Sequence, residues 1–491
     1  MAPPLELHSF LFGSISVLLF GVIAAVVAHR RYYAQNATSM TNVDFVTARN
    51  SLGVLTIAWS IYSNAIGAGT AFFPPSYATT PGVGLLGLFS NAIANVIPPL
   101  FIAFFGTKIR QDYPEALSLS HFMYLRYGRI VQVIVGILVM FNMAIALTVE
   151  YTAISSIYRD LVGSSYSIVI LFIIGVVTAA YTAYGGLYAS LVTDRFQGFA
   201  GIMLIGIISL YIAFGAQISL DRPFPQELLI PDSVGWSSIF VLPVSILTGT
   251  LLSEASFQRA WAAYDDRTLK RGAILGSFFI FIVVSLFALG GILAVWMGRT
   301  VSNPNNILFA LIGPPYAPTA LTVVVVVVVT IMNTSAVDSI QNGLVSVVTS
   351  NLLANQNVWY SRFLTVFLNA ICLLVGYLGL NSIVTLFAIT NIITTMASVF
   401  FAGLFDTKRK YVTRGGVLFG FGFSIVNIVI YGWIAKGDIL KGLRFVFLED
   451  VYNYPTFLVA LTSWVGLLLY QVSYFLIARR RKLRVGISDE L

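Results

Sequence analysis

Charged residues are scarce in this chain. Asp, Glu, Lys and Arg make up only 10% of its 491 residues, whereas they make up about 25% of a typical soluble domain. Hydrophobic residues account for 58% of the chain. This composition excludes a soluble globular protein.

Cysteine and histidine are nearly missing. The single cysteine, Cys372, allows no disulfide within the chain and no thiolate metal site. His8, His29 and His121 are too few and too scattered for a zinc cluster. A phosphate loop of the type G-x-x-x-x-G-K is also missing, which disfavours an ATP-driven pump. No nucleophile has a neighbouring His partner. We therefore expect no enzyme, no catalytic residue and no cofactor beyond a coupling ion.

What the chain does contain is long apolar runs. Runs of about 20 apolar residues match the hydrocarbon thickness of a bilayer, and they recur from end to end. The sequence predicts an all-α, polytopic membrane protein that forms a single transmembrane domain over residues 1–491. Thirteen spans are expected near residues 9–28, 54–78, 84–106, 130–156, 165–184, 197–217, 237–255, 273–297, 318–350, 363–379, 382–404, 416–435 and 455–477.

Basic residues predict the orientation. Loops that follow odd-numbered spans, together with the tail, hold 22 of the 28 Lys and Arg residues. Because Lys and Arg concentrate on the cytoplasmic side, the N-terminus is expected outside and the C-terminus in the cytoplasm. An odd number of spans also places the two ends on opposite sides, so the span count and the charge bias agree. The first span is expected to be an uncleaved anchor, since no cleavage-site pattern follows it, and the plasma membrane is the expected location.

Two spans contain helix-breaking residues. Residues 54–78 include Gly67, Gly69, Pro74 and Pro75, and residues 237–255 include Pro243 and Gly249. Interrupted spans at matching places in two halves indicate a transporter with inverted repeats. The halves would be residues 54–217 and 237–404, flanked by an extra span in 1–53 and two spans in 405–491. For 237–255 alone, the general frequency of Gly and Pro in membrane helices is the simpler explanation.

A motif at the end of the fifth span resembles a family signature. The stretch "YTAYGGLYASLVTDRFQ" (181–197) is similar to the signature of the sodium/solute symporter family, and "SFQRAWAAYDDRTLKRGA" (256–273) resembles a second conserved segment of that family. The resemblance implies the leucine-transporter type of fold, with two inverted five-helix repeats. The "TSAVD" run of span 9 is similar to the fungal and plant urea active transporters.

The resemblance also implies a sodium site between the break in residues 54–78 and span 9. Hard cations take oxygen ligands, and the matching positions are the carbonyls of Ser63, Ile66 and Met332, the hydroxyl of Ser335, and position 336. Ala336 has no side-chain oxygen, and Thr334 is a poorly directed substitute. Asp194 would lie near the exit route of the ion, or would instead pair with Arg195 or another basic loop residue.

Asp338 is the most unusual residue of span 9. An acid at the bilayer centre costs at least about 2.5 kcal/mol, and Asp338 lies about 20 Å deep at 1.5 Å per helical residue. Ser335, Asp338 and Asn342 share one helical face. Asp338 would either strengthen the depleted sodium site or carry a coupling proton.

The substrate is expected to contact polar and aromatic residues near the break. These are Asn64, Trp59, Tyr62, Thr70 and Asn333, with Asn142, Ser245 and Thr248 as further polar groups at membrane depth. Trp and Tyr in a bundle more often serve packing. No Lys or Arg is expected inside the spans, which favours a neutral or cationic solute, and Glu150 and Glu254 are expected to be solvated at span ends.

These observations predict a secondary active transporter. It would couple Na⁺ or H⁺ to the symport of a small polar solute, such as urea or a polyamine, across the bilayer. The alternatives are a symporter of proline-like amino acids, or an uncoupled facilitator or channel of the same fold, as the alanine at position 336 suggests. Nucleic acid is not an expected partner, and the oligomeric state is left open.

Overall fold

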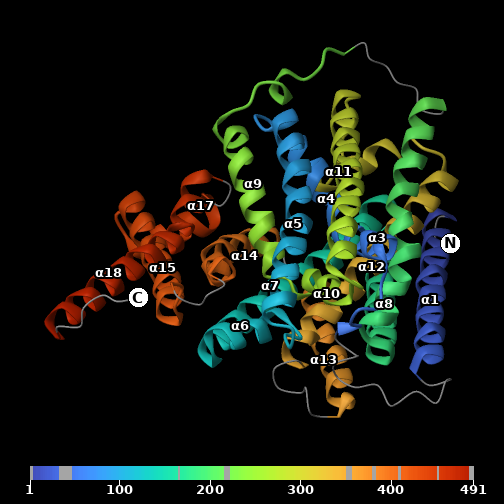
Figure 1. The fold of residues 1–491 in the computed structure, drawn as a ribbon. Helices are drawn as coiled ribbons and strands as arrows, with labels where there is room; N and C mark the ends of the chain where they lie inside the picture. Colours follow the sequence, from blue (N-terminus) through green and yellow to red (C-terminus); the bar gives the residue numbers. More distant parts are fainter. Residues whose placement is uncertain are drawn as a thin grey trace.

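The computed structural model describes residues 4–32, 47–163, 166–214, 222–349, 357–378, 383–406, 411–450 and 453–485. These residues form helices and connecting loops (Figure 1). Among them, Leu52 and Ala263 form a single isolated β-bridge. The α-helices are α1 (Pro4–Tyr32), α3 (Val54–Ala65), α4 (Ala68–Ala78), α5 (Gly84–Asp112), α6 (Leu119–Tyr127), α7 (Arg129–Leu161), α8 (Ser167–Phe214), α9 (Ser233–Leu251), α10 (Glu254–Ala262), α11 (Asp266–Trp296), α12 (Thr319–Val348), α13 (Val358–Tyr377), α14 (Ile383–Ala397), α15 (Arg414–Lys436), α16 (Ile439–Arg444), α17 (Tyr454–Ala460) and α18 (Thr462–Val485). Short turns of 3₁₀ or π geometry are η2 (Gln226–Leu228), η3 (Pro304–Leu311), η5 (Ser398–Phe405) and η6 (Phe445–Glu449).

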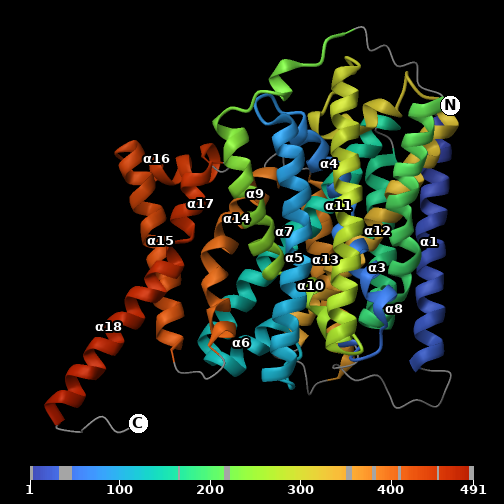
Figure 2. The same cartoon turned by 45° about the horizontal axis from the view of Figure 1, so that its top comes forward.

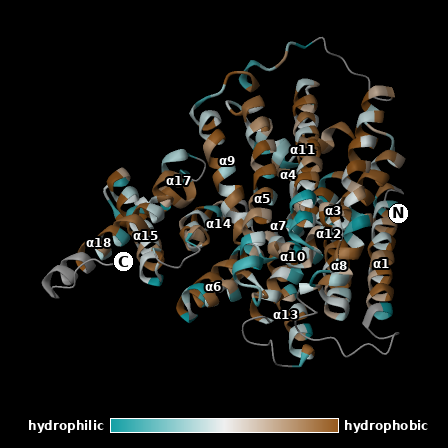
Figure 3. Ribbon diagram, in the orientation of Figure 1, coloured by the Kyte–Doolittle hydropathy of each residue, from teal (hydrophilic) through white to brown (hydrophobic). Residues whose placement is uncertain are grey.

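The long helices agree with the expected spans. Within the described residues, 11 helical segments are long and apolar enough to cross a membrane. The interrupted pair α3 and α4 provides one more crossing, and α8 provides two instead of one. Large apolar side chains such as Phe12, Ile15 and Val22 of α1 are exposed on the outer surface, as expected for helices that face lipid. Figure 3 shows hydrophobic residues along the length of these helices.

α8 reverses direction at Gly186. This residue has φ 58° and ψ −157° inside the helix, a conformation that favours glycine. Before the reversal, Gly185 lies against Ala28 near the end of α1; after it, Gly198 lies against Ser63, and Tyr211 donates a hydrogen bond to the carbonyl of Tyr316 just before α12. The glycine pair of the signature motif therefore forms the turn between two antiparallel spans.

The break in the first interrupted span lies at Ile66 and Gly67. Ile66 (φ −113°, ψ 84°) ends α3, and Gly67 (φ −108°, ψ −166°) precedes α4. The Thr70 hydroxyl donates to the carbonyl of Ala65 at 2.7 Å and so satisfies one carbonyl that the break releases. Pro74 and Pro75 lie inside α4 and do not cause the break, contrary to their expected role.

The second interrupted span is also real, but its break lies beyond the expected residues. Pro243 and Gly249 both lie within α9, and the helix stops at Leu252 and Ser253 before α10 begins. The amide of Asn142 donates to the carbonyls of Gly249 (3.0 Å) and Leu252 (3.1 Å). The expectation that this span is uninterrupted was therefore wrong, although Pro243 and Gly249 lie within α9 and do not cause the break.

α12 is one continuous helix through the valine run, residues 323–329, and the polar segment that follows it, residues 333–342. It packs against α8, α7 and α1, and its polar residues are buried rather than frayed at an end. α15 and α18 pack on each other to one side of this bundle, and α18 extends away from it (Figure 2). The interrupted helices thus lie in the main bundle beside α12. The boundaries of the two repeats stay a prediction.

Candidate substrate and ion site

A cavity of about 550 Å³ lies between the two interrupted helices and α5, α7 and α14. Cavities of this size suit small ligands. Its polar lining includes Asn64 and Thr70 beside the first break, Asn142 and Ser245 beside the second, and the two charged residues Glu150 and Arg259. It extends to Thr80 after α4 and to Val234 at the start of α9, so it reaches toward the end of the bundle where those segments lie.

Glu150 of α7 is bound to the N-terminus of α4. Its carboxylate accepts the N–H of Gly69 at 3.2 and 3.3 Å and the side-chain amide of Asn333 at 2.9 Å. The amide of Asn333 also donates to the Glu150 carbonyl at 3.1 Å. A helix N-terminus stabilises negative charge through its free N–H groups and its dipole. Asn333 therefore positions Glu150 at the break, and Glu150 is only 9% exposed.

A second buried network surrounds Asp194 of α8. Its carboxylate accepts hydrogen bonds from Ser60 of α3 (2.6 Å) and Ser335 of α12 (2.9 Å). Arg259 of α10 forms an ion pair with it at 3.3 Å. The guanidinium also donates to Ser60 (3.0 Å) and Ser339 (2.6 Å). Asp194 therefore connects the first interrupted span, the second interrupted span and α12.

Asp338 lies on the α8 side of α12 and accepts two hydroxyl hydrogen bonds. Tyr181 donates to one oxygen at 2.5 Å and Ser190 to the other at 2.9 Å. Both partners belong to the segment that resembles the symporter signature. Among the described residues no Lys, Arg or His forms an ion pair with Asp338. Asp194, Asp338 and Arg259 together contain one more acidic than basic group, which suits an additional cation or proton.

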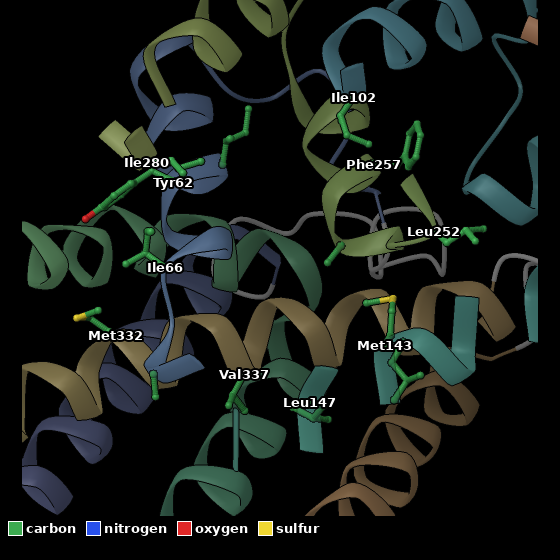
Figure 4. Close-up of a cluster of buried hydrophobic side chains, with 14 of the residues drawn as sticks. Tyr62, Ile66, Ile102, Met143, Leu147, Leu252, Phe257, Ile280, Met332 and Val337 are labelled. Carbon is green, nitrogen blue, oxygen red and sulfur yellow. The ribbon is translucent and has the colours of Figure 1, made fainter. Parts of the chain in front are cut away.

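The positions expected to bind sodium are brought together only in part. Ser335 points to Asp194, and Ser63 lies near Gly198 of α8. Ile66 and Met332 belong to one buried hydrophobic cluster (Figure 4). Thr334 donates to the carbonyl of Thr330 in its own helix. Ala336 is buried and contributes no oxygen, so these positions stay a prediction.

The positions expected to bind substrate divide into two groups. Asn64 and Thr70 line the cavity, and Asn333 reaches its edge through Glu150. Trp59 instead stacks on Phe279 at 5.2 Å, and Tyr62 packs edge-on against both rings. Neither aromatic residue lines the cavity, in agreement with the packing interpretation. Ser245 lines it, whereas Thr248 bonds to Thr395 at 3.0 Å.

Three expectations about charged residues were wrong. Glu150 is buried at the break, and Glu254 is fully buried, where it accepts the N–H of Leu119 at 2.7 Å. Arg259 was counted with the loop residues, yet it is fully buried and lines the cavity. The alternative that Asp194 pairs with Arg195 or another basic loop residue is met by Arg259, which had been assigned to a loop. The FQR sequence of the second family segment was the available signal for Arg259.

Two curated proteins of related sequence are transporters. The chain is 25% identical over 401 residues to the spermidine transporter DUR31 of Candida albicans. The aligned region covers 80% of this chain and 76% of that protein. It is 25% identical over 297 residues to the sodium/pantothenate symporter of Escherichia coli, covering 58% and 59% of the two chains. No family model matches the chain.

Solved structures establish the type of fold. A Na⁺-coupled sialic acid symporter in a substrate-bound, outward-open state aligns with a TM-score of 0.70 at 15% identity, covering 94% of this chain and 97% of that one. Mhp1, a nucleobase-cation-symport-1 family transporter in a closed conformation, aligns with a TM-score of 0.55 at 14% identity, covering 90% and 96%. The fold is that of the leucine-transporter type.

Proposed function

We propose that this chain is a secondary active transporter that couples a cation gradient to the symport of a small polar solute. The observation that carries the proposal is the cavity between two interrupted membrane helices, with buried carboxylates beside it. Transporters of this architecture bind substrate and ion where discontinuous helices meet, near the middle of the membrane. The two related transporters support the same activity.

Membership of the sodium/solute symporter family is part of this proposal. The segments around Gly186 and Arg259 that resemble the family are the segments that supply Asp194, Tyr181 and Arg259 to the buried network. A polyamine is the preferred solute, because the related protein of Candida albicans is a spermidine transporter. The comparisons offer no support for urea. The N-terminus is proposed to lie outside and the C-terminus in the cytoplasm of a plasma-membrane protein.

We propose that the coupling cation acts beside Asp194, Asp338 and Arg259, which together contain one more acidic than basic group. A proton would neutralise Asp338 directly, whereas Na⁺ would need the carbonyls of Ser63, Ile66 and Met332 with the hydroxyl of Ser335. Both ions remove the cost of an unpaired buried charge.

Replacing Asp338 by Asn tests the coupling role. We expect the variant to insert normally and to lose concentrative uptake, because Asn keeps the shape but removes the charge that the ion or proton neutralises. The assay measures uptake of labelled spermidine into proteoliposomes. Uptake is compared with a Na⁺ gradient and with Na⁺ replaced by choline, each at two pH values. D438N, at the exposed cap of α16, is the matched control. Full accumulation by D338N would contradict the role of Asp338.

The same assay separates the uncoupled alternative, which Ala336 favours because it removes one expected ligand. A facilitator would equilibrate spermidine across the membrane without accumulating it. Its flux would not change when ionophores collapse the Na⁺ and pH gradients. Ionophore-sensitive accumulation by the unaltered chain would exclude the facilitator.

A further inference from the structure

The anion-binding end of α4 is already occupied by the protein itself. In transporters with broken helices, the N-terminus of a half-helix is the place that receives anionic groups of a substrate. Here the Glu150 carboxylate accepts the N–H of Gly69 and fills that place. A solute carboxylate that approached the same N-terminus would meet a like charge.

Glycine makes this arrangement sterically possible. A Cβ atom on Gly67 would lie 2.5 to 2.6 Å from the three atoms of the Glu150 carboxyl group, and one on Gly69 would lie 2.8 Å from its Oε1. Real Cβ contacts are longer than this, so side chains at either position would displace the carboxylate. The Gly-Ala-Gly sequence at residues 67–69 thus accounts both for the helix break and for the space that the Glu150 carboxylate occupies.

Of the other polar groups of the cavity, Asn64 offers an unused acceptor, whereas Arg259 donates its hydrogen bonds to the protein itself. The side-chain oxygen of Asn64 is buried and has no hydrogen-bond partner within the described structure, and Asn64 lines the cavity together with Glu150. Arg259 lines the cavity as well, but its guanidinium already donates to Ala255, Asp194, Ser60 and Ser339. It is therefore committed to the protein and is poorly placed to hold a solute anion.

The apolar part of the lining suits the carbon chain of an amine. Phe73 of α4 and Phe387 of α14 both line the cavity, and their rings stack with centroids 5.7 Å apart. Aromatic rings cover methylene groups and also attract cations. The cavity thus combines a buried carboxylate, a free acceptor oxygen and an aromatic wall.

We propose that Glu150 is the counter-ion for an ammonium group of the solute, that Asn64 accepts a further N–H, and that the cavity excludes solutes with a carboxylate. This inference rests on the proposed function only in that solute binds in this cavity. The ammonium replaces water at the exposed edge of Glu150 while Gly69 and Asn333 keep the carboxylate in position. The solute class is therefore organic amines.

Equilibrium binding to the purified full chain in lipid nanodiscs tests the inference without any gradient. The probes are spermidine as a cation, urea as a neutral solute and pantothenate as an anion. We expect the unaltered chain to bind spermidine and not pantothenate. Glu150→Gln should weaken spermidine binding at least tenfold, because it removes the charge and keeps the side-chain shape. Glu150→Asp should retain the preference for spermidine over pantothenate.

Glu254→Gln is the matched control, because Glu254 is another buried carboxylate at a helix break but does not line the cavity. It should leave the spermidine affinity within twofold. Binding of pantothenate in preference to spermidine by the unaltered chain would overturn the inference even if a variant fails to fold. Unchanged spermidine affinity in E150Q would overturn it too.

Failure of this inference is distinguishable from failure of the proposed function. If spermidine binds through Glu150 but no gradient drives its accumulation in proteoliposomes, symport fails and the role of Glu150 stands. If the E150Q variant accumulates solute normally, symport stands and the role of Glu150 fails.

Discussion

At the scale of single residues, the space beside Glu150 decides whether the site can form. Gly67 has a backbone conformation that alanine tolerates, with φ −108°, so the constraint on this position is steric and not conformational. The carboxylate that a Cβ would meet is held by Gly69 and Asn333. It cannot move without losing these hydrogen bonds.

Gly67→Ala should therefore destabilise the protein and impair solute binding. Overpacking of a filled interior costs about 1–3 kcal/mol, and we expect a lower thermal unfolding midpoint together with at least a tenfold loss of spermidine affinity. Gly53→Ala is the control, because nothing lies within 4 Å of a Cβ atom at Gly53. Adding Glu150→Ala to G67A should restore the unfolding midpoint but not the affinity. Normal binding by G67A would contradict the proposed packing.

At the scale of elements, each interrupted span needs a partner for the backbone groups that its break releases. Thr70 serves the first break from within the same span. Asn142 of α7 serves the second break from a neighbouring helix, through hydrogen bonds to Gly249 and Leu252. α7 therefore supports both breaks, since it also carries Glu150.

Asn142→Ala should destabilise the junction of α9 and α10. An unsatisfied buried polar group costs about 1–3 kcal/mol, and this substitution removes the donor from two carbonyls. We expect a clear fall in the thermal unfolding midpoint and faster hydrogen exchange at the start of α10. Asn427→Ala is the comparison, since its amide bonds to Thr462 between α15 and α18. Equal losses in the two variants would argue against a special role of the break.

The sequence was most informative about elements, because the length of an apolar run reports directly on the bilayer. It predicted the continuous helix through the valine run and the buried polar face of Ser335 and Asp338. It did not reveal the partners of these residues. Glu150 meets Gly69 across 81 positions, and Arg259 meets Asp194 across 65. Such pairs depend on how the helices pack. Because Glu150 and Arg259 are charged, the sequence indicated solvated positions at span ends or in loops for both of them.

At the scale of the whole molecule, the two interrupted spans are joined at one end of the bundle. The N–H groups of Ser51 and Leu52 donate to the carbonyl of Ala262, and Tyr264 donates back to Leu52. Arg110 of α5 donates to the carbonyls of Ala260 and Ala263, each at 2.9 Å. The cavity reaches toward the opposite end, at Thr80 and Val234. This structure is thus closed at the end that holds Arg110.

Alternating access requires this closed end to separate. Weakening the closure should therefore raise the fraction of molecules that are open at the Arg110 end. Arg110→Ala removes charged hydrogen bonds to two carbonyls, each worth about 1.5–3 kcal/mol, and a change of 1.4 kcal/mol is about tenfold in an equilibrium.

A cysteine introduced at Ser256, which lines the cavity, reports the opening in a chain whose buried Cys372 is replaced by Ser. We expect R110A to raise its labelling by a membrane-impermeant maleimide at least tenfold when the reagent is on the Arg110 side. Exposed Arg271→Ala should leave the rate unchanged, and an equal rise in both variants would show that surface charge and not the closure controls access.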